Sequence, residues 1–314
     1  MISQVNRRQF LARTTLATAA VLRVPSLLAT GDSHPARLSR KGLPRFLPGL
    51  AAYSFRDYMK HSSHACDRVV AESDLIDLFQ FVDYAADRGC VGAELTSYYF
   101  PPDVSHEYLV DIRRHAFLRG VQISGTAVGN TFALPDGRKL DEQIAHVNRW
   151  VDHCVLMGAP HVRVFSGVAE GISTEEAKKQ CIKSLRRCGD YAGGHGVMLG
   201  IENHGGLVSS AELLEEIVNE VNHDWVRVNL DTGNFYSDHP YEDMERLAPY
   251  AVNVQFKVEI NRVPGGKEPS DFERMVKILR AANYQGYVSL EYESAEAPYA
   301  AVPKHLDRLK GLLR

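Results

Sequence analysis

The chain has 314 residues, of which 45% are hydrophobic and 24% are charged. This hydrophobic share is typical of a folded globular protein and excludes a chain that is disordered throughout. The net charge of −3 at pH 7 differs from that of a basic nucleic-acid-binding protein, so no nucleic-acid partner is expected. The length accommodates either two average domains or one α/β barrel of about 250 residues.

The N-terminus carries the pattern of an export signal. Arg7 and Arg8 precede a run of small and apolar residues from Thr14 to Leu22. Paired arginines before a mildly apolar stretch resemble a twin-arginine signal, and the run is shorter than the ~20 residues of a membrane span. We expect residues 1–30 to be this signal and residues 31–47 a linker, with the protein exported or periplasmic. The alternative is an extension without an export role, which leaves the protein in the cytoplasm.

The five cysteines are scattered along the chain. They form no C-x-x-C pair and no dense framework, so we interpret them as small buried side chains, with a free thiol or a single disulfide left open. Their positions are 66, 90, 154, 181 and 188.

Short apolar runs alternate with amphipathic stretches after the linker. Eight runs have the character of strands, and they start 25 to 41 residues apart, as βα units require. Several are apolar on both faces, which is typical of a parallel sheet covered on both sides. The predicted strands are Leu50–Phe55, Val91–Leu95, Val121–Val128, His161–Phe165, Val197–Glu202, Val226–Asp231, Ala251–Val258 and Gly286–Glu291.

Helical periodicity fills the segments between these strands. Apolar residues recur at helical spacing in Leu75–Arg88 and in Phe272–Ala282. The segment Ser209–Val221 starts with a predicted capping box, because Ser209 stands three residues before Glu212. Residues Val302–Leu313 are expected to form the closing helix.

Eight βα units without a long break favour one (β/α)8 TIM barrel over residues 48–314. The second possibility is an open doubly wound sheet. Its dinucleotide-binding form usually has a glycine-rich turn after the first strand, and the corresponding residues 54–57 contain no glycine.

Carboxylates end three of the predicted strands. Glu202, Asp231 and Glu291 follow apolar runs at the strand ends where the chemistry of such a barrel takes place. Crowding three carboxylates costs several kcal/mol unless a cation compensates, and an oxygen-rich site suits Mg²⁺ or Mn²⁺. The strand between the last two offers Gln255 and Lys257. We interpret the cluster as a metal site; the alternative is a structural ion network in which Lys257 balances the charge.

Four segments resemble the xylose-isomerase-like TIM-barrel superfamily, and more narrowly its sugar phosphate isomerase/epimerase group. The resemblance covers roughly residues 48 to 313. The segments are Leu199–His204, Val228–Asn234, Gln255–Lys257 and Val288–Glu291.

The resemblance implies a divalent metal, often Mn²⁺, held by Glu202, Asp231, position 255 and Glu291. The family commonly has histidine at position 255 in a His-x-Lys pattern, whereas this chain has Gln255. An amide oxygen can bind a hard cation, so we expect Mn²⁺ or Mg²⁺. In the epimerases of the family the two glutamates exchange protons with a substrate carbon, and here they are Glu202 and Glu291.

The same chemistry follows from the residue types. Removal of a proton beside a carbonyl gives an enediolate, whose charge a cation stabilises, and a carboxylate on each face allows inversion. Lys257 is expected to stabilise the enediolate or to neutralise the carboxylates. His204 and Arg163 are candidates for binding sugar hydroxyls. Glu94 is a candidate for substrate contact, with an ion pair to Arg163 or Lys257 as its alternative.

The expected function is a divalent-metal-dependent sugar isomerase or epimerase that acts through an enediolate on a carbohydrate or polyol ketone. A lyase or dehydratase begins with the same proton abstraction. A hydrolase related to the apurinic-site endonucleases would need many strand-end histidines, and only His204 of the 13 histidines follows a predicted metal-site strand. A non-catalytic sugar-binding barrel is a further alternative, which Gln255 favours. The oligomeric state is not predicted.

Overall fold

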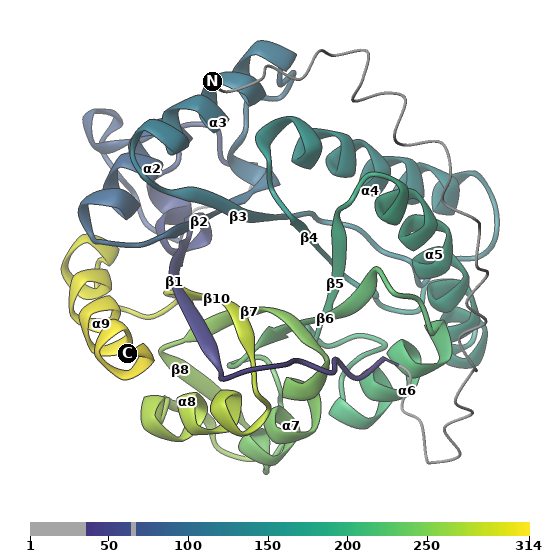
Figure 1. The fold of residues 1–314 in the computed structure, drawn as a ribbon. Helices are drawn as coiled ribbons and strands as arrows, with labels where there is room; N and C mark the ends of the chain where they lie inside the picture. Colours follow the sequence, from purple (N-terminus) through teal and green to yellow (C-terminus); the bar gives the residue numbers. More distant parts are fainter. Residues whose placement is uncertain (1–35, 64–66) are drawn as a thin grey trace, which may run out of the picture. The chain divides into compact units, whose positions relative to one another are not determined.

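The structure is a computed structural model that describes residues 36–63 and 67–314. Eight parallel strands close into a barrel in the order β1-β10-β7-β6-β5-β4-β3-β2, and helices surround it (Figure 1). The prediction of a single (β/α)8 TIM barrel is therefore confirmed. The barrel strands are β1 Arg45–Ala51, β2 Gly92–Thr96, β3 Gln122–Ala127, β4 His161–Val164, β5 Met198–Glu202, β6 Val226–Asp231, β7 Ala251–Lys257 and β10 Gln285–Glu291.

The α-helices bury one apolar side each against the strands and expose the other. They are α2 Leu78–Asp87, α3 His106–Leu118, α4 Arg138–Met157, α5 Thr174–Gly194, α6 Ala211–Val221, α7 Pro240–Leu247, α8 Phe272–Ala281 and α9 Pro298–Leu313. Short 3₁₀ segments are Ala52–Tyr58, Glu72–Asp74, Ser97–Tyr99 and Ala248–Tyr250, and an antiparallel hairpin of β8 Glu259–Arg262 and β9 Gly266–Pro269 follows β7. None of the helices within residues 36–63 and 67–314 is both long and apolar enough to cross a membrane.

The first barrel strand lies five residues earlier than predicted. Strand β1 pairs with β10 from Arg45 to Leu50, and residues 52–58 form a 3₁₀ helix instead of a strand. The apolar residues of this region are buried in the strand and in the 3₁₀ helix alike, so apolar content did not separate the two. The predicted linker over residues 31–47 consequently contains the start of β1. The signal predicted for residues 1–30 lies outside the described residues.

Two helix starts were also misplaced. Helix α6 is capped by Ser210, whose hydroxyl accepts from the Leu213 backbone N–H at 3.2 Å, so the capping box assigned to Ser209 and Glu212 was wrong by one residue. Helix α2 has the capping box that the sequence analysis did not find, between Asp77 and Gln80. The side chain of each cap satisfies a backbone donor that the first helical turn leaves unpaired.

The cysteines within the described residues carry free thiols and are buried: Cys90, Cys154, Cys181 and Cys188. Cys66 lies outside the described residues. Burial raises the pKa of the Cys90 thiol to about 12, so this side chain stays a neutral thiol at ordinary pH.

A buried histidine fills the barrel interior beneath the strand ends. The His161 side chain packs beside Gly125 and Gly200, which leave room for its ring. Burial lowers the pKa of His161 to about 3, so the imidazole is neutral. A Cβ atom at position 200 would lie 2.4 Å from His161 Nε2 and 2.9 Å from Asn229 Cβ.

We therefore expect Gly200→Ala to lower the free energy of unfolding by about 1–3 kcal/mol, as overpacking of a tight core does. Gly194→Ala is the matched control, because its Cβ atom would meet no other atom within 4 Å and alanine favours the helix by up to about 1 kcal/mol. Urea unfolding of both variants gives the comparison. Equal stability of the two variants would contradict the packing described around His161.

Candidate active site

The predicted site residues come together at the C-terminal ends of β5, β6, β7 and β10. Asp231 is the register partner of Gln255, and Glu291 is the register partner of Lys257. Every one of these side chains, and that of Glu202, is at most 6% exposed. The strand ends thus create a buried group of carboxylates around one lysine.

The Lys257 ammonium lies among three carboxylates. Its Nζ atom is 3.2 Å from Asp231 Oδ2 and 3.0 Å from Glu291 Oε2, and it also contacts the Glu293 carboxylate. Burial opposes the charged lysine, but these carboxylates outweigh it and raise the pKa of Lys257 well above its ordinary value. The chain itself therefore supplies a cation to this part of the site.

The Arg163 guanidinium is the second cation of the site and forms an ion pair with Glu202. Arg163 Nε lies 2.9 Å from Glu202 Oε2, and its other nitrogen donates to the Val128 carbonyl oxygen at 2.9 Å. The guanidinium is 3.8 Å from the centre of the Phe165 ring, and it forms a hydrogen bond with the Tyr98 side chain. Carbonyl, ring and hydroxyl together fix the orientation in which Arg163 meets the carboxylate.

Burial shifts the proton affinity of the carboxylates. It raises the pKa of Glu202, against the lowering effect of Arg163 and Lys257, and it raises the pKa of Glu291 well above its ordinary value. Burial also raises the pKa of Asp231 to about 6. Asp231 is held by hydrogen bonds from Gly233 N and Asn234 Nδ2, each 2.8 Å long. Acid groups with raised pKa values are suited to proton transfer near neutral pH.

An amide network lies next to this cluster and includes Glu94. The Glu94 carboxylate accepts hydrogen bonds from Asn253 Nδ2 at 2.9 Å and from Gln255 Nε2 at 3.0 Å. Asn229 Nδ2 donates to Gln255 Oε1 at 2.8 Å and to Glu202 Oε2 at 3.3 Å. Glu94 is fully buried, and among the described residues it pairs with these two amides and with neither Arg163 nor Lys257, so it orients Gln255. The role of Glu94 in substrate contact stays a prediction.

His204 lies at the edge of the site. Its side chain is exposed and its ring centre is 4.5 Å from that of Phe165, which in turn stacks with Arg163. The structure thus places His204 against the Phe165 ring, where desolvation lowers the pKa of its imidazole and the Asp231 carboxylate opposes that shift.

The donor set fits a hard divalent ion in its chemistry. Glu202, Asp231, Gln255 and Glu291 offer carboxylate and amide oxygens, which Mg²⁺ and Mn²⁺ prefer. Asp231 and Glu291 already converge on one positive centre, the Lys257 ammonium. In the part of the chain that the structure describes, no three His, Cys, Asp or Glu side chains are arranged around a point that a metal could occupy. In this structure the Lys257 ammonium neutralises the carboxylates of Asp231 and Glu291.

Sequence reasoning missed three members of the site. Glu293 lies two residues beyond Glu291 and reaches the same lysine, which the two-residue period of extended chain could have indicated. Asn229 and Asn253 are polar residues inside otherwise apolar strands, and a buried amide of this kind needs partners. Their spacing in the sequence gave no means of pairing them with Glu94.

Comparison with known proteins identifies a family whose model matches most of the chain. Residues 82–311 match the family model of the xylose isomerase-like TIM barrel. A 2-oxo-tetronate isomerase from Haemophilus influenzae is 28% identical in an alignment 172 residues long, which covers 51% of this chain and 65% of that protein. The match therefore spans less than two thirds of the relative's length.

Solved structures share the fold at low sequence identity. D-psicose 3-epimerase from Clostridium cellulolyticum H10, solved with D-tagatose, gives a TM-score of 0.68 at 14% identity, covering 85% of this chain and 99% of that one. A xylose isomerase-like TIM-barrel protein from Mycobacterium smegmatis in complex with magnesium gives 0.66 at 16% identity, covering 86% and 96%. Since the family model matches most of the chain, this protein belongs to the xylose isomerase-like TIM-barrel family.

Proposed function

We propose that this protein is a sugar isomerase or epimerase that moves a proton between positions beside a carbonyl group. The observation that carries the proposal is a pair of buried glutamates with raised pKa values, each held by its own cation: Glu202 by Arg163 and Glu291 by Lys257. Relatives with this fold include a 2-oxo-tetronate isomerase and a D-psicose 3-epimerase, which supports a keto sugar or keto acid as the substrate class.

The reaction follows from the properties of these side chains. One glutamate removes the proton from the carbon next to the carbonyl, and the pair of electrons moves to the carbonyl oxygen to give an enediolate. Lys257 and Arg163 stabilise the negative charge that develops on oxygen. Return of a proton by the other glutamate inverts the carbon or moves the carbonyl to the neighbouring carbon, and general acid–base catalysis of this kind contributes about 10²- to 10⁴-fold.

The proposed cofactor is Mn²⁺ or Mg²⁺, which Glu202, Asp231, Gln255 and Glu291 would hold. When bound, the ion supplies further positive charge to the enediolate oxygens. Gln255 is kept in one amide orientation by Glu94 and Asn229, and Asn203 Oδ1 accepts from the Asp231 backbone N–H at 2.9 Å. These contacts fix the orientation of Gln255 and the backbone of Asp231, two of the four residues that would hold the ion.

The direct test is hydrogen exchange. The purified chain is incubated with keto sugars and keto acids in D₂O in the presence of Mn²⁺, and the carbon-bound protons are followed by NMR. We expect loss of the proton beside the carbonyl together with appearance of the isomer or epimer. A complete lack of exchange in every ketose and keto acid tested would overturn the proposal.

Removal of divalent ions should separate activity from stability. We expect dialysis against a chelator to lower turnover at least tenfold and Mn²⁺ to restore it. The melting temperature should change little, because Lys257 neutralises Asp231 and Glu291 in the absence of an ion. Turnover and thermal melting are measured on the same samples. Full activity after chelation would contradict the proposed cofactor without affecting the glutamate pair.

A further inference from the structure

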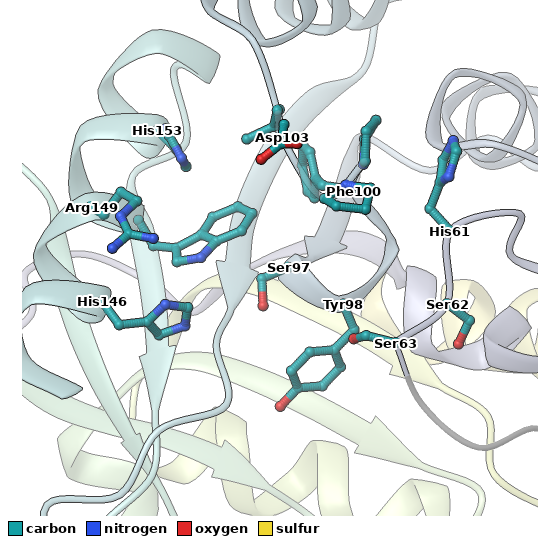
Figure 2. A pocket seen from close by; sticks show the side chains of 14 residues that line it. His61, Ser62, Ser63, Ser97, Tyr98, Phe100, Asp103, His146, Arg149 and His153 are labelled. Carbon is teal, nitrogen blue, oxygen red and sulfur yellow. The ribbon is translucent and has the colours of Figure 1, made fainter. Parts of the chain in front are cut away.

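A cavity of about 740 Å³ lies outside the carboxylate cluster, between helix α4 and the segment that follows β2. Its volume is that of a small-molecule site. Figure 2 shows His146, Arg149 and His153 along one helix, across the cavity from Asp103, with Tyr98 between them and the barrel. The proposed reaction uses none of the side chains that α4 contributes.

One face of α4 supplies the helical wall. His146, Arg149, Trp150 and His153 recur at the spacing that places residues on the same side of a helix. Trp150 is 7% exposed, and its ring packs on Phe100 and His153. Ring packing of this kind fixes the direction of the indole, including its N–H group.

Three polar groups of this wall point to a ligand. Within residues 36–63 and 67–314, no hydrogen bond uses the Trp150 indole N–H or the His146 ring, and no ion pair includes Arg149. Trp150, His146 and Arg149 line the cavity, so their donor groups are available to a ligand there. Burial and then Arg149 lower the pKa of His146, so its neutral ring keeps one N–H donor.

The cavity borders the catalytic face. Tyr98 lines it, and the Tyr98 side chain forms a hydrogen bond with Arg163, which pairs with Glu202 at 2.9 Å. A single chain of contacts therefore leads from the cavity to a proton-transferring carboxylate. A substrate that reached from one to the other would carry a group beyond its reacting carbons.

The chemistry of the wall selects an acidic group. A guanidinium, an indole N–H and an imidazole form a donor-rich surface with one permanent positive charge, which matches the oxygens of a carboxylate or phosphate. Asp103 lies on the opposite wall and forms no ion pair with Arg149 at 4.0 Å or less. We propose that this cavity binds an anionic group at the far end of the substrate, so that the protein acts on acidic sugars in preference to neutral ones. This inference rests on the proposed function, which supplies the reaction. The side chains of α4 supply the preference for an acidic substrate.

Binding is tested without turnover. The chain has two tryptophans, so a Trp225→Phe background leaves Trp150 as the fluorescent reporter. Inorganic phosphate and gluconate are titrated separately at constant ionic strength, which distinguishes the phosphate source from the carboxylate source. We expect saturable quenching by at least one of them, weakened about tenfold or more by Arg149→Met, as loss of a charge-assisted hydrogen bond predicts.

The matched control is Arg138→Met, which removes a positive charge from the same helix outside the cavity. With substrates, Arg149→Met should raise KM for acidic sugars about tenfold and leave both kcat and the KM for neutral ketoses unchanged. Trp150→Phe should likewise raise KM for acidic sugars and leave KM for neutral ketoses unchanged. Thermal melting checks that this variant is folded.

Equal effects of Arg149→Met and Arg138→Met, or no quenching by either anion, would overturn the inference. Turnover of neutral ketoses without an acidic preference would do the same and leave the proposed function standing. If no sugar reacts but an anion quenches Trp150 and Arg149→Met weakens that binding, the proposed function is wrong and the proposal of an anion site still stands.

Discussion

Glu291→Gln is expected to lower kcat by about 10²- to 10⁴-fold while the protein stays folded. Glutamine has the shape of glutamate but cannot accept a proton, so the catalytic contribution of an acid–base group is lost. Lys257 keeps its contacts with Asp231 and Glu293 in this variant, which preserves the local charge balance. Steady-state kinetics and thermal melting on the same preparation test both parts of the expectation.

Glu293→Gln is the matched control for this experiment. It removes a carboxylate from the same lysine but leaves both glutamates of the proposed proton transfer in place. We expect less than a tenfold change in kcat. In D₂O, Glu291→Gln should still exchange the proton that Glu202 removes without converting the substrate. Wild-type conversion by Glu291→Gln, or an equal loss in the control, would exclude the assigned role.

Glu202→Gln should behave differently because its partner is Arg163. That guanidinium is 5% exposed and would lose its charged partner, so we expect reduced stability as well as reduced activity. For this reason Glu291 is the better position at which to measure the loss of activity without a loss of stability.

Lys257→Met is expected to have the largest effect on stability. It leaves Asp231, Glu291 and Glu293 without the ammonium that lies among them, and loss of one partner from a buried ion cluster costs about 3–5 kcal/mol. Urea unfolding measures the difference. Lys179→Met is the control, because Lys179 forms an exposed pair with Glu175 and such pairs contribute about 0–1 kcal/mol.

The stability deficit of Lys257→Met should depend on pH. Burial already raises the pKa of Asp231 to about 6 and that of Glu291 well above its ordinary value, and loss of the ammonium raises both further. An acid whose pKa is higher in the folded state stabilises the fold at low pH and loses that contribution as pH rises through the folded pKa. The deficit should therefore grow between pH 5 and pH 8. A deficit independent of pH, or a variant as stable as Lys179→Met, would contradict the charge balance described here.

The fold was predictable because the alternation of apolar strands and amphipathic helices can be recognised from short segments of the sequence. Eight apolar runs separated by helical segments determine a closed parallel barrel, and seven of the eight predicted strands overlap extensively with the observed ones. The first strand was misplaced because its apolar residues continue into a buried 3₁₀ helix. The carboxylates at the strand ends were predictable from the general rule that barrel chemistry lies there.

The partners of these carboxylates were not predictable in the same way. That Lys257 contacts Asp231 and Glu291 was open as an alternative to a metal, and the choice depends on where a flexible side chain points. Glu94 and Gln255 are separated by 161 positions, and their contact depends on closure of the barrel. Side-chain direction and the pairing of side chains across the barrel interior are properties of the folded chain and have no signature in local spacing.

The hydrogen bonds of Gln255 also limit how this protein can change. The amide donates to Glu94 and accepts from Asn229, whereas a neutral imidazole has one donor and one acceptor in a different, rigid geometry. Exchange of Gln255 for histidine alone would change the geometry of both buried hydrogen bonds. Redesign of position 255 therefore has to treat Glu94, Asn229 and Gln255 as one hydrogen-bonded unit.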